Sequence, residues 1–205
     1  MEFILVSACL VGESVRYNGG DKRTDHPVLQ RWLGEGRVVT VCPEVAGGLS
    51  VPRPPAEIVG AAGGLSVLSG VARVIDDRGR DVTGQFVRGA EHALAVARSK
   101  SIRIAVLKEG SPSCGLGYIY DGSFTGTRVS DVGVTAACLE RAGIYVFSEA
   151  QLEEADLRLR RFEDGFASLR LPLRLCEKLF KPSKRFSQRR KGRRKDAESR
   201  GGVNA

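Results

Sequence analysis

The sequence lacks the features of membrane and secreted proteins. None of the apolar runs in its 205 residues approaches the ~20 residues needed to cross a bilayer. The N-terminus has an acid, Glu2, where a secretory signal would carry positive charge, and the apolar run after it is too short for such a signal. We therefore expect a cytoplasmic protein that has no membrane partner.

Cysteine is scarce, and histidine is scarcer. The five cysteines are an odd number without a dense framework, so a disulfide scaffold is not expected in a reducing compartment. The chain has no Cys-x-x-Cys pair, which closed structural zinc sites often contain. Neither histidine is an obvious further ligand, because His26 precedes a proline at a predicted helix start and His92 lies within a helical pattern. These absences disfavour a closed zinc site.

Net charge is absent from most of the chain. Residues 181–205 hold ten Lys and Arg residues and two acids, so this segment carries the whole formal net charge of +8 and residues 1–180 are neutral. Because the segment has few apolar residues to bury, we expect a disordered basic tail. Such a tail either binds the phosphates of a nucleic acid or is a solvated extension with no dedicated partner.

Four short apolar runs bounded by Gly, Pro or Ser predict buried strands of a largely parallel sheet. These strands are expected at 3–8, 38–41, 102–107 and 144–147. Helical patterns between them predict a helix at 83–100, capped by Thr83, and another at 131–142 that stops at Gly143. This alternation implies an α/β fold, a layered and mostly parallel sheet with helices on its faces.

The remaining segments complete the predicted organisation. Ser148 to Gln151 fits a capping box that starts a further helix, and residues 71–82 fit a β-hairpin whose turn is at 77–80. We expect three parts, which are a main domain at 1–150, a helical extension at 151–180 and the disordered basic tail at 181–205.

Three of the cysteines lie where predicted strands end. Cys9 follows the first strand, Cys42 follows the second, and Cys114 comes a few residues after the third. The carboxyl ends of parallel strands meet at one edge of the sheet, where α/β proteins hold their ligands. We therefore expect these three thiols to meet in one pocket.

Two interpretations of the three thiols stay open at this level. Free cysteine is commonly a small buried hydrophobic residue, as we expect for Cys138 and Cys176 among their apolar neighbours. The other three instead stand beside Gly, Pro or polar residues, and soft thiolates select zinc, copper(I) or iron–sulfur clusters. Three cysteines can hold a cubane by three of its irons and leave the fourth iron open for a substrate.

Ordered motifs surround these cysteines and extend over residues 1 to about 150. They are CLVG at 9–12, VRYNG at 15–19, CPEVAGGL at 42–49, PRPPAE at 52–57, GSPSCG at 110–115, IYDGSF at 119–124 and GVTAA at 133–137. In this order the motifs resemble the thiouracil desulfidase family. Their number and order make the resemblance specific.

The resemblance implies a [4Fe-4S] cluster on Cys9, Cys42 and Cys114, with one iron free of protein ligands. The enzyme would remove sulfur from a small thiolated heterocycle, such as a 2-thiouracil-like base, its nucleoside or a thiouridine in tRNA. Sulfide and the carbonyl product would leave without net redox change. The resemblance also implies that Glu44 is the general acid/base and that Ser111 binds substrate or positions water. From the residues alone, Glu44 can also cap a loop and Ser111 can close a turn.

Further residues of these motifs have expected but weaker roles. Ser113 is a weaker candidate for the role of Ser111, and Arg16, Tyr17 and Arg53 either line the pocket or have surface or ion-pair roles. Four glycines are expected to let backbone amides approach the cluster. They are Gly47, Gly48, Gly110 and Gly115.

The chain also departs from the family pattern. Asn18 stands where the family often has Asp, and residues 151–180 are too few for the second domain with which some relatives engage thiolated tRNA. The basic tail at 181–205 is a candidate substitute for that domain. Two other functions stay open, an RNA-associated protein with a structural metal and an electron carrier or redox sensor. Because simple electron carriers hold clusters by four cysteines, a three-cysteine site favours the enzyme.

Overall fold

The computed structural model describes residues 1–60 and 62–164. The predicted basic tail at 181–205, Cys176 and the last part of the predicted extension at 151–180 lie outside the described residues. Among the helices of the described part, none is long and apolar enough to cross a membrane.

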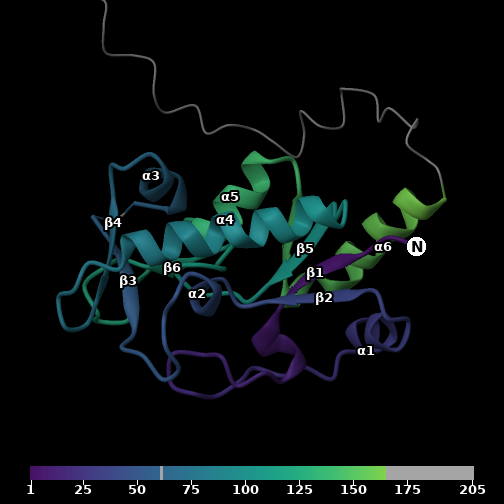
Figure 1. The fold of residues 1–205 in the computed structure, drawn as a ribbon, viewed down its shortest axis with the longest axis horizontal. Coiled ribbons are helices and arrows are strands. Elements are labelled where there is room, and N and C mark those ends of the chain that lie inside the picture. The colour runs from purple at the N-terminus through teal and green to yellow at the C-terminus, as the bar shows by residue number, and fades with distance from the viewer. Residues whose placement is uncertain (61, 165–205) are drawn as a thin grey trace, which may run out of the picture. The chain divides into compact units, whose positions relative to one another are not determined.

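Four parallel strands form the centre of the fold (Figure 1). They are β1 (Ile4–Ser7), β2 (Val38–Val41), β5 (Ile104–Leu107) and β8 (Tyr145–Ser148), in the order β2-β1-β5-β8. Ile4 lies opposite Val38 on one side and Ile104 on the other. The predicted parallel sheet is therefore confirmed, and the two central strands, β1 and β5, are buried along their whole length.

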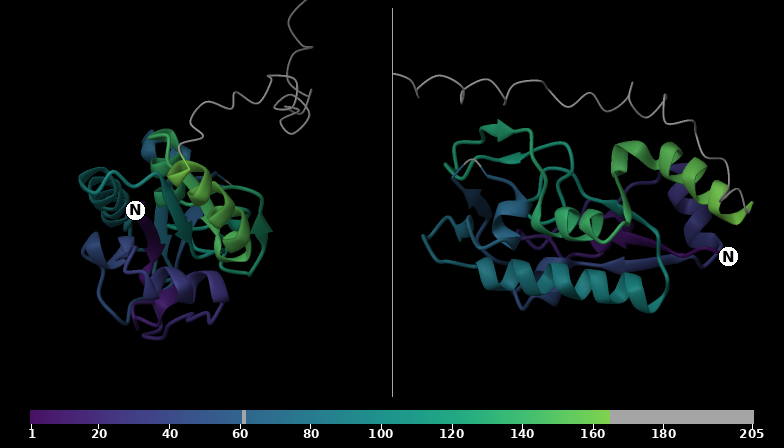
Figure 2. Two further views of the ribbon diagram at one scale, coloured as in Figure 1. Left: turned by 90° about the vertical axis from the view of Figure 1, so that its right-hand side faces the viewer. Right: turned by 90° about the horizontal axis from the view of Figure 1, so that it is seen from above.

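Helices cover both faces of this sheet, as Figure 2 shows for α4 and α6. The helices are α1 (Pro27–Gly34), α2 (Pro43–Ala46), α3 (Gly64–Leu68), α4 (Thr83–Ser99), α5 (Val134–Arg141) and α6 (Leu152–Glu163), with short 3-10 helices η1 (Ala8–Val11) and η2 (Glu149–Gln151). Alternate β1 side chains face opposite layers. Ile4 packs with Trp32 of α1 and Leu159 of α6, whereas Leu5 packs with Ala93 of α4 and Leu139 of α5.

Two small antiparallel sheets extend the molecule beyond the parallel one. They are β3 (Ala56–Val59) with β4 (Arg73–Asp76), and β6 (Ile119–Tyr120) with β7 (Arg128–Val129). The hairpin predicted at 71–82 is only partly correct, because its turn and a bridge from Ile75 to Asp81 form but β4 pairs with β3. Local sequence shows the turn, but it does not show a partner strand that lies further back in the chain.

Two of the three predicted helix boundaries follow the expected chemistry. The Ser148–Gln151 capping box is present and leads through η2 into α6, and Gly143 just beyond α5 has the left-handed φ of 81°. Thr83 is not the cap of α4, because it is the first residue of the helix itself. Its hydroxyl oxygen instead accepts a hydrogen bond from Val74 N at 2.9 Å, while the Asp81 carboxylate accepts one from Thr83 N.

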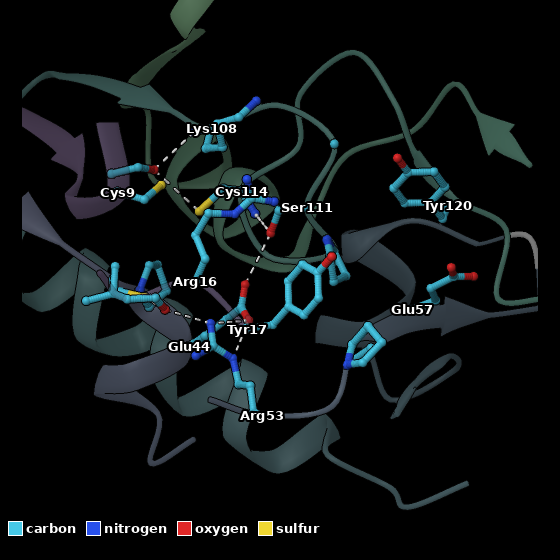
Figure 3. A pocket seen from close by; sticks show the side chains of 18 of the residues that line it. Cys9, Arg16, Tyr17, Glu44, Arg53, Glu57, Lys108, Ser111, Cys114 and Tyr120 are labelled. Atoms are coloured by element: carbon cyan, nitrogen blue, oxygen red, sulfur yellow. Dashed lines mark hydrogen bonds and ion pairs between the residues drawn. The ribbon is translucent and has the colours of Figure 1, made fainter. Parts of the chain in front are cut away.

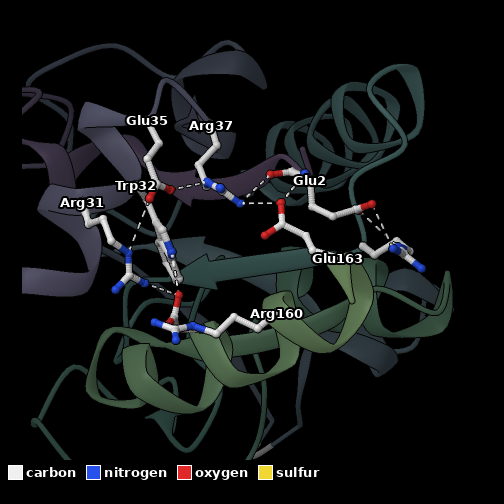
Figure 4. Close-up of polar contacts among 9 residues, drawn as sticks. Glu2, Arg31, Trp32, Glu35, Arg37, Arg160 and Glu163 are labelled. Atoms are coloured by element: carbon white, nitrogen blue, oxygen red, sulfur yellow. Dashed lines mark hydrogen bonds and ion pairs between the residues drawn. The ribbon is translucent and has the colours of Figure 1, made fainter. Parts of the chain in front are cut away.

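Side-chain contacts fasten α6 to α1 and to the amino edge of the sheet, and we call this group the α6 clamp (Figure 4). Its members are Arg31, Trp32, Arg37, Asp156 and Glu163. Asp156, buried at 5% exposure, accepts a hydrogen bond from Trp32 Nε1 at 3.0 Å and pairs with Arg31. Burial alone would raise the pKa of Asp156, but these hydrogen bonds lower it below its ordinary value. The helix therefore belongs to the core, and the predicted boundary at 150 stays a prediction.

Candidate functional site

The three cysteine segments meet at one cavity of about 480 Å³ at the carboxyl edge of the sheet. Cys9, Cys42 and Cys114 all line it, and so do Glu44 and Ser111. Residues far apart in the sequence meet here because β1, β2 and β5 are parallel neighbours whose following loops leave the sheet on the same side. The expected meeting of the three thiols in one pocket is confirmed.

Cys9 lies in η1, directly after β1, and is 8% exposed. Its carbonyl oxygen accepts a hydrogen bond from Lys22 N at 2.9 Å, so the loop that follows η1 returns to this residue. Gly12 ends η1 with a φ of 97°, a backbone conformation that favours glycine. The thiol is thus held between a buried strand and a returning loop.

Cys42 is the residue that precedes α2, and Pro43 begins that helix. Its thiol lies 3.8 Å from Val15 O, to which it can donate a weak hydrogen bond. A Cβ at Gly47 would lie 2.0 Å from Gln85 O of α4, so this glycine lets α2 pack directly on α4. The small size of Gly47 therefore positions the Cys42 segment, and its expected role at the cluster stays a prediction.

Cys114 is held by the start of α5. Val134 N donates to Pro112 O at 2.9 Å and Thr135 N donates to Ser113 O at 2.8 Å. The buried hydroxyls of Ser113 and Thr135 are 2.9 Å apart, and Ser113 does not line the cavity. The structure thus gives Ser113 a packing role, and it explains why the GVTAA segment accompanies the cysteine motifs.

In the chain without a metal, burial disfavours the thiolate form of all three cysteines. Burial raises the pKa of Cys9 to about 11, with Cys42 adding to the effect and the positive charges of Arg16 and Lys108 opposing it. Burial also raises the pKa of Cys42 and that of Cys114, whose Sγ accepts a hydrogen bond from Ser7 Oγ at 3.6 Å. Ligation of a metal by these thiolates would therefore release protons.

Glu44 is held between Arg53 and Ser111 (Figure 3). Its Oε2 accepts hydrogen bonds from Arg53 Nε at 2.9 Å and pairs with Nη2 at 2.8 Å, while its Oε1 accepts one from Ser111 Oγ at 3.3 Å. The Arg53 side chain is 5% exposed and also donates to Val15 O. Arg53 is therefore a pocket residue rather than a surface residue, and it orients the carboxylate of Glu44.

Ser111 closes the turn that carries Cys114 and also contacts Glu44. Its hydroxyl oxygen accepts hydrogen bonds from Ser113 N at 3.0 Å and Cys114 N at 3.2 Å, which closes the turn that carries Cys114. The same hydroxyl donates to Glu44 in the cavity. Turn formation and a polar contact to Glu44 are thus compatible at this residue.

The cavity also contains residues to which sequence reasoning gave no role. Lys108 follows β5, donates to Glu109 O at 3.1 Å and pairs with Glu149. Glu57, Tyr120 and Phe124 line the cavity from the small sheets and the turn between β6 and β7. Glu57 lies in the PRPPAE motif and the other two lie in the IYDGSF motif, so the motifs were the available signal.

The donor chemistry of the cavity suits an iron–sulfur cluster. Cys9, Cys42 and Cys114 are free thiols from three separate segments, and soft thiolates are the usual ligands of such clusters. Cys138 is also free but packs beside the buried cluster that contains Phe86 and Val134, away from the cavity lining, as expected for a structural residue. Within residues 1–60 and 62–164, no three His, Cys, Asp or Glu side chains are grouped to hold a single metal ion.

Comparison with known proteins agrees with the motif resemblance. The family model described as 2-thiouracil desulfurase matches residues 4–151. The uncharacterized protein YbbK of Bacillus subtilis (strain 168) is 44% identical over 151 residues, which cover 74% of this chain and 98% of YbbK. A solved structure, the [4Fe-4S]-dependent thiouracil desulfidase TudS, matches with a TM-score of 0.71 and 49% identity over 78% of this chain and 99% of its own.

Proposed function

Because the chain belongs to the 2-thiouracil desulfurase family, we propose that it replaces the sulfur of a thiolated pyrimidine with oxygen and releases sulfide without net redox change. The single observation that carries the proposal is the convergence of Cys9, Cys42, Cys114, Glu44 and Ser111 on one cavity. A cavity of about 480 Å³ has the size of a small-molecule site and suits a thiouracil-like base or nucleoside.

We assign Cys9, Cys42 and Cys114 as the ligands of a [4Fe-4S] cluster. The TudS structure, which is 49% identical, is that of a [4Fe-4S]-dependent enzyme, and this likeness supports the assignment. Each cysteine ligand of a cubane binds a different iron, so the thiols need to surround a common space rather than meet at one ion. When bound, such a cluster with three protein ligands supplies one open iron, a Lewis acid that polarises the carbon–sulfur bond of the substrate.

The side chains of the chain then handle water and protons. We assign Glu44 Oε1 as the atom that takes a proton from the water attacking the thiocarbonyl carbon and returns it to the departing sulfur. Ser111 Oγ, 3.3 Å from that atom, orients the water or the substrate. Arg53 keeps the carboxylate in place through Oε2 and leaves Oε1 for the proton transfer. Water and the thiocarbonyl compound are consumed, and the carbonyl compound and hydrogen sulfide are formed, so atoms and electrons balance.

The choice among a base, a nucleoside and tRNA is part of the proposal. The cavity itself is sized for the base or nucleoside, and we propose that residues 181–205 bring thiolated tRNA to it through their net charge of +8. We place the activity in the cytoplasm, as the sequence predicts, since free cysteine ligands persist in a reducing compartment.

The experiment that tests the function is iron and sulfide analysis of anaerobically reconstituted protein, with spectra recorded with and without 2-thiouracil. We expect about four irons and four sulfides per chain, a spectrum that 2-thiouracil changes, and release of sulfide and uracil. Cys42→Ala should lose the cluster, whereas the matched control Cys138→Ala, which removes a thiol outside the cavity, should keep it. Bound zinc, or a cluster that no thiolated compound affects, would overturn the proposal in favour of a structural metal or an electron carrier.

A further inference from the structure

The cavity has a second polar region, away from the thiols. Figure 3 shows Glu57 and Tyr120 on the side of the pocket opposite Cys9 and Lys108. Glu57 lies on β3, and Tyr120 is the last residue of β6. The chemistry proposed above gives neither residue a task.

Glu57 is a buried carboxylate with only one oxygen in use. The residue is 9% exposed, and its Oε2 accepts hydrogen bonds from Gly122 N and from Phe124 N, both at 3.0 Å. Within the described residues, no hydrogen bond reaches Oε1. The only fully buried side-chain oxygen or nitrogen there without a hydrogen bond is Arg37 Nε, which still forms an ion pair with Glu35. Oε1 is therefore not fully buried, and Glu57 is one of the residues that line the cavity.

The backbone opposite Glu57 holds this carboxylate in a fixed position. Phe124, whose side chain lines the cavity, has a φ of 58°, in the left-handed region that bulky residues avoid. Gly122 has a φ of 87°, and a Cβ there would lie 2.7 Å from Ile58 O of β3. Both residues donate to Glu57 Oε2, so a turn with an unfavourable backbone is fastened to β3 at the cavity wall. Such local strain is characteristic of functional sites.

We propose that Glu57 Oε1 accepts a hydrogen bond from an N–H or O–H group of the substrate and so determines which thiolated compounds bind. This inference rests on the proposed function and adds to it the recognition of the part of the substrate that does not react. The Glu57 carboxylate accepts both of its observed hydrogen bonds, and an acceptor oxygen selects a donor at this position. The ring of Phe124 provides an apolar wall beside the same space.

Two sources can supply the donor. A thiouracil base carries ring N–H groups, whereas a nucleoside has lost the N1 hydrogen but carries sugar hydroxyls. Both present the same chemistry to Glu57, and the experiment distinguishes them with 2-thiouracil, its 1-methyl and 3-methyl derivatives, and 2-thiouridine.

The decisive variant is Glu57→Gln in the reconstituted protein. The amide oxygen of glutamine can still accept the hydrogen bonds from Gly122 N and Phe124 N, so the turn stays fastened. Its NH₂ group then replaces Oε1, which turns an acceptor toward the cavity into a donor. Glu153→Gln, on the exposed surface of α6, is the matched control for the loss of one negative charge.

Two readouts are needed, KM in turnover and the calorimetric Kd of the products uracil, 1-methyluracil, 3-methyluracil and uridine. Glu57→Gln should raise both constants about 10- to 100-fold for the ligand that carries the donor, as expected for a lost hydrogen bond to a charged group. Methylation of the donor should weaken binding to the wild type by a similar factor. It should not weaken binding to the variant any further. If Glu57→Gln changes the binding of the base, the donor is a ring N–H. If it changes the binding of the nucleoside alone, the donor is a sugar hydroxyl.

The outcomes separate this inference from the proposed function. If the wild type turns over substrate and Glu57→Gln has the same KM and Kd as the wild type for every ligand, the role of Glu57 is overturned. The proposed desulfuration then stays intact. Product binding that depends on Glu57, in a protein that releases no sulfide, would overturn the desulfuration and keep the recognition site. The melting temperature of Glu57→Gln should be close to that of Glu153→Gln, which would show that the turn is preserved.

Discussion

The cavity and the α6 clamp use buried polar groups in opposite ways. In the clamp, both oxygens of Asp156 are occupied, Oδ1 by Arg31 and Trp32 and Oδ2 by Arg160. In the cavity, three thiols and Glu57 Oε1 are left for other partners. Saturated networks fix a unique packing, whereas groups with spare bonding capacity mark a place where something binds. Substitutions should therefore separate stability from activity.

The largest expected effect is on the chemical step. Glu44→Gln keeps the shape of the side chain and an acceptor for Arg53, but it removes the group that we propose transfers the proton. We expect kcat with 2-thiouracil to fall about 100-fold or more, with the cluster content and the melting temperature close to those of the wild type. A kcat within about twofold of the wild type would contradict the assignment of Glu44 and make it a structural cap.

The corresponding change in the clamp should affect folding instead. Asp156→Ala leaves the buried indole N–H of Trp32 without an acceptor and removes the partner of Arg31. We expect the free energy of unfolding to fall by about 2–3 kcal/mol, with kcat per folded molecule unchanged at a temperature where the variant is folded. Denaturant unfolding followed by circular dichroism measures the first quantity. A loss of kcat in fully folded Asp156→Ala would show that the two regions are coupled.

The clamp also predicts a pH dependence. Because the pKa of Asp156 is lower in the folded chain, its contribution to stability is complete above the unfolded value of about 3.9 and is lost as the pH falls through the folded value. The free energy of unfolding should therefore fall less steeply in Asp156→Asn than in the wild type as the pH falls below about 4. Equal slopes in the two proteins would contradict this assignment.

An intermediate effect is expected from the basic segment at 181–205. Removing residues 181–205 takes away a net charge of +8, so tRNA affinity at low salt should fall about 10-fold or more and lose most of its salt dependence. Turnover of free 2-thiouracil should be unaffected, because the cavity residues are all retained. Filter binding at several salt concentrations measures the first effect, and unchanged RNA affinity would exclude the segment as an RNA-binding element.

The smallest effect is expected where a thiol belongs to neither region. Cys138 packs against the buried cluster that contains Phe86 and Val134, and Cys138→Ala should change the free energy of unfolding by only about 1 kcal/mol. Iron content and turnover should equal those of the wild type. A loss of iron in this variant would show that the cluster draws on a fourth cysteine, contrary to the three-ligand assignment.

Sequence reasoning succeeded for features that local pattern encodes. The strands that hold the sheet are short, β-branched and continuous, and the Ser148–Gln151 capping box is a local exchange of hydrogen bonds. It failed where a distant partner decides the outcome. The pairing of β4 with β3, the α2–α4 contact at Gly47 and the contact of Thr83 with Val74 all join segments that no local pattern connects.

The sequence by itself determined the parallel sheet, the family and the set of three cysteines at strand ends, because hydrophobic period, motifs and the succession of segments along the chain are properties of the chain. Tertiary structure alone decided how Arg53 holds Glu44, how Ser111 serves both a turn and the cavity, and why Glu57 keeps one oxygen free. The physical reason is that hydrogen-bond saturation depends on which donors and acceptors reach each atom in three dimensions, so identical residue types become a clamp in one place and a binding site in another.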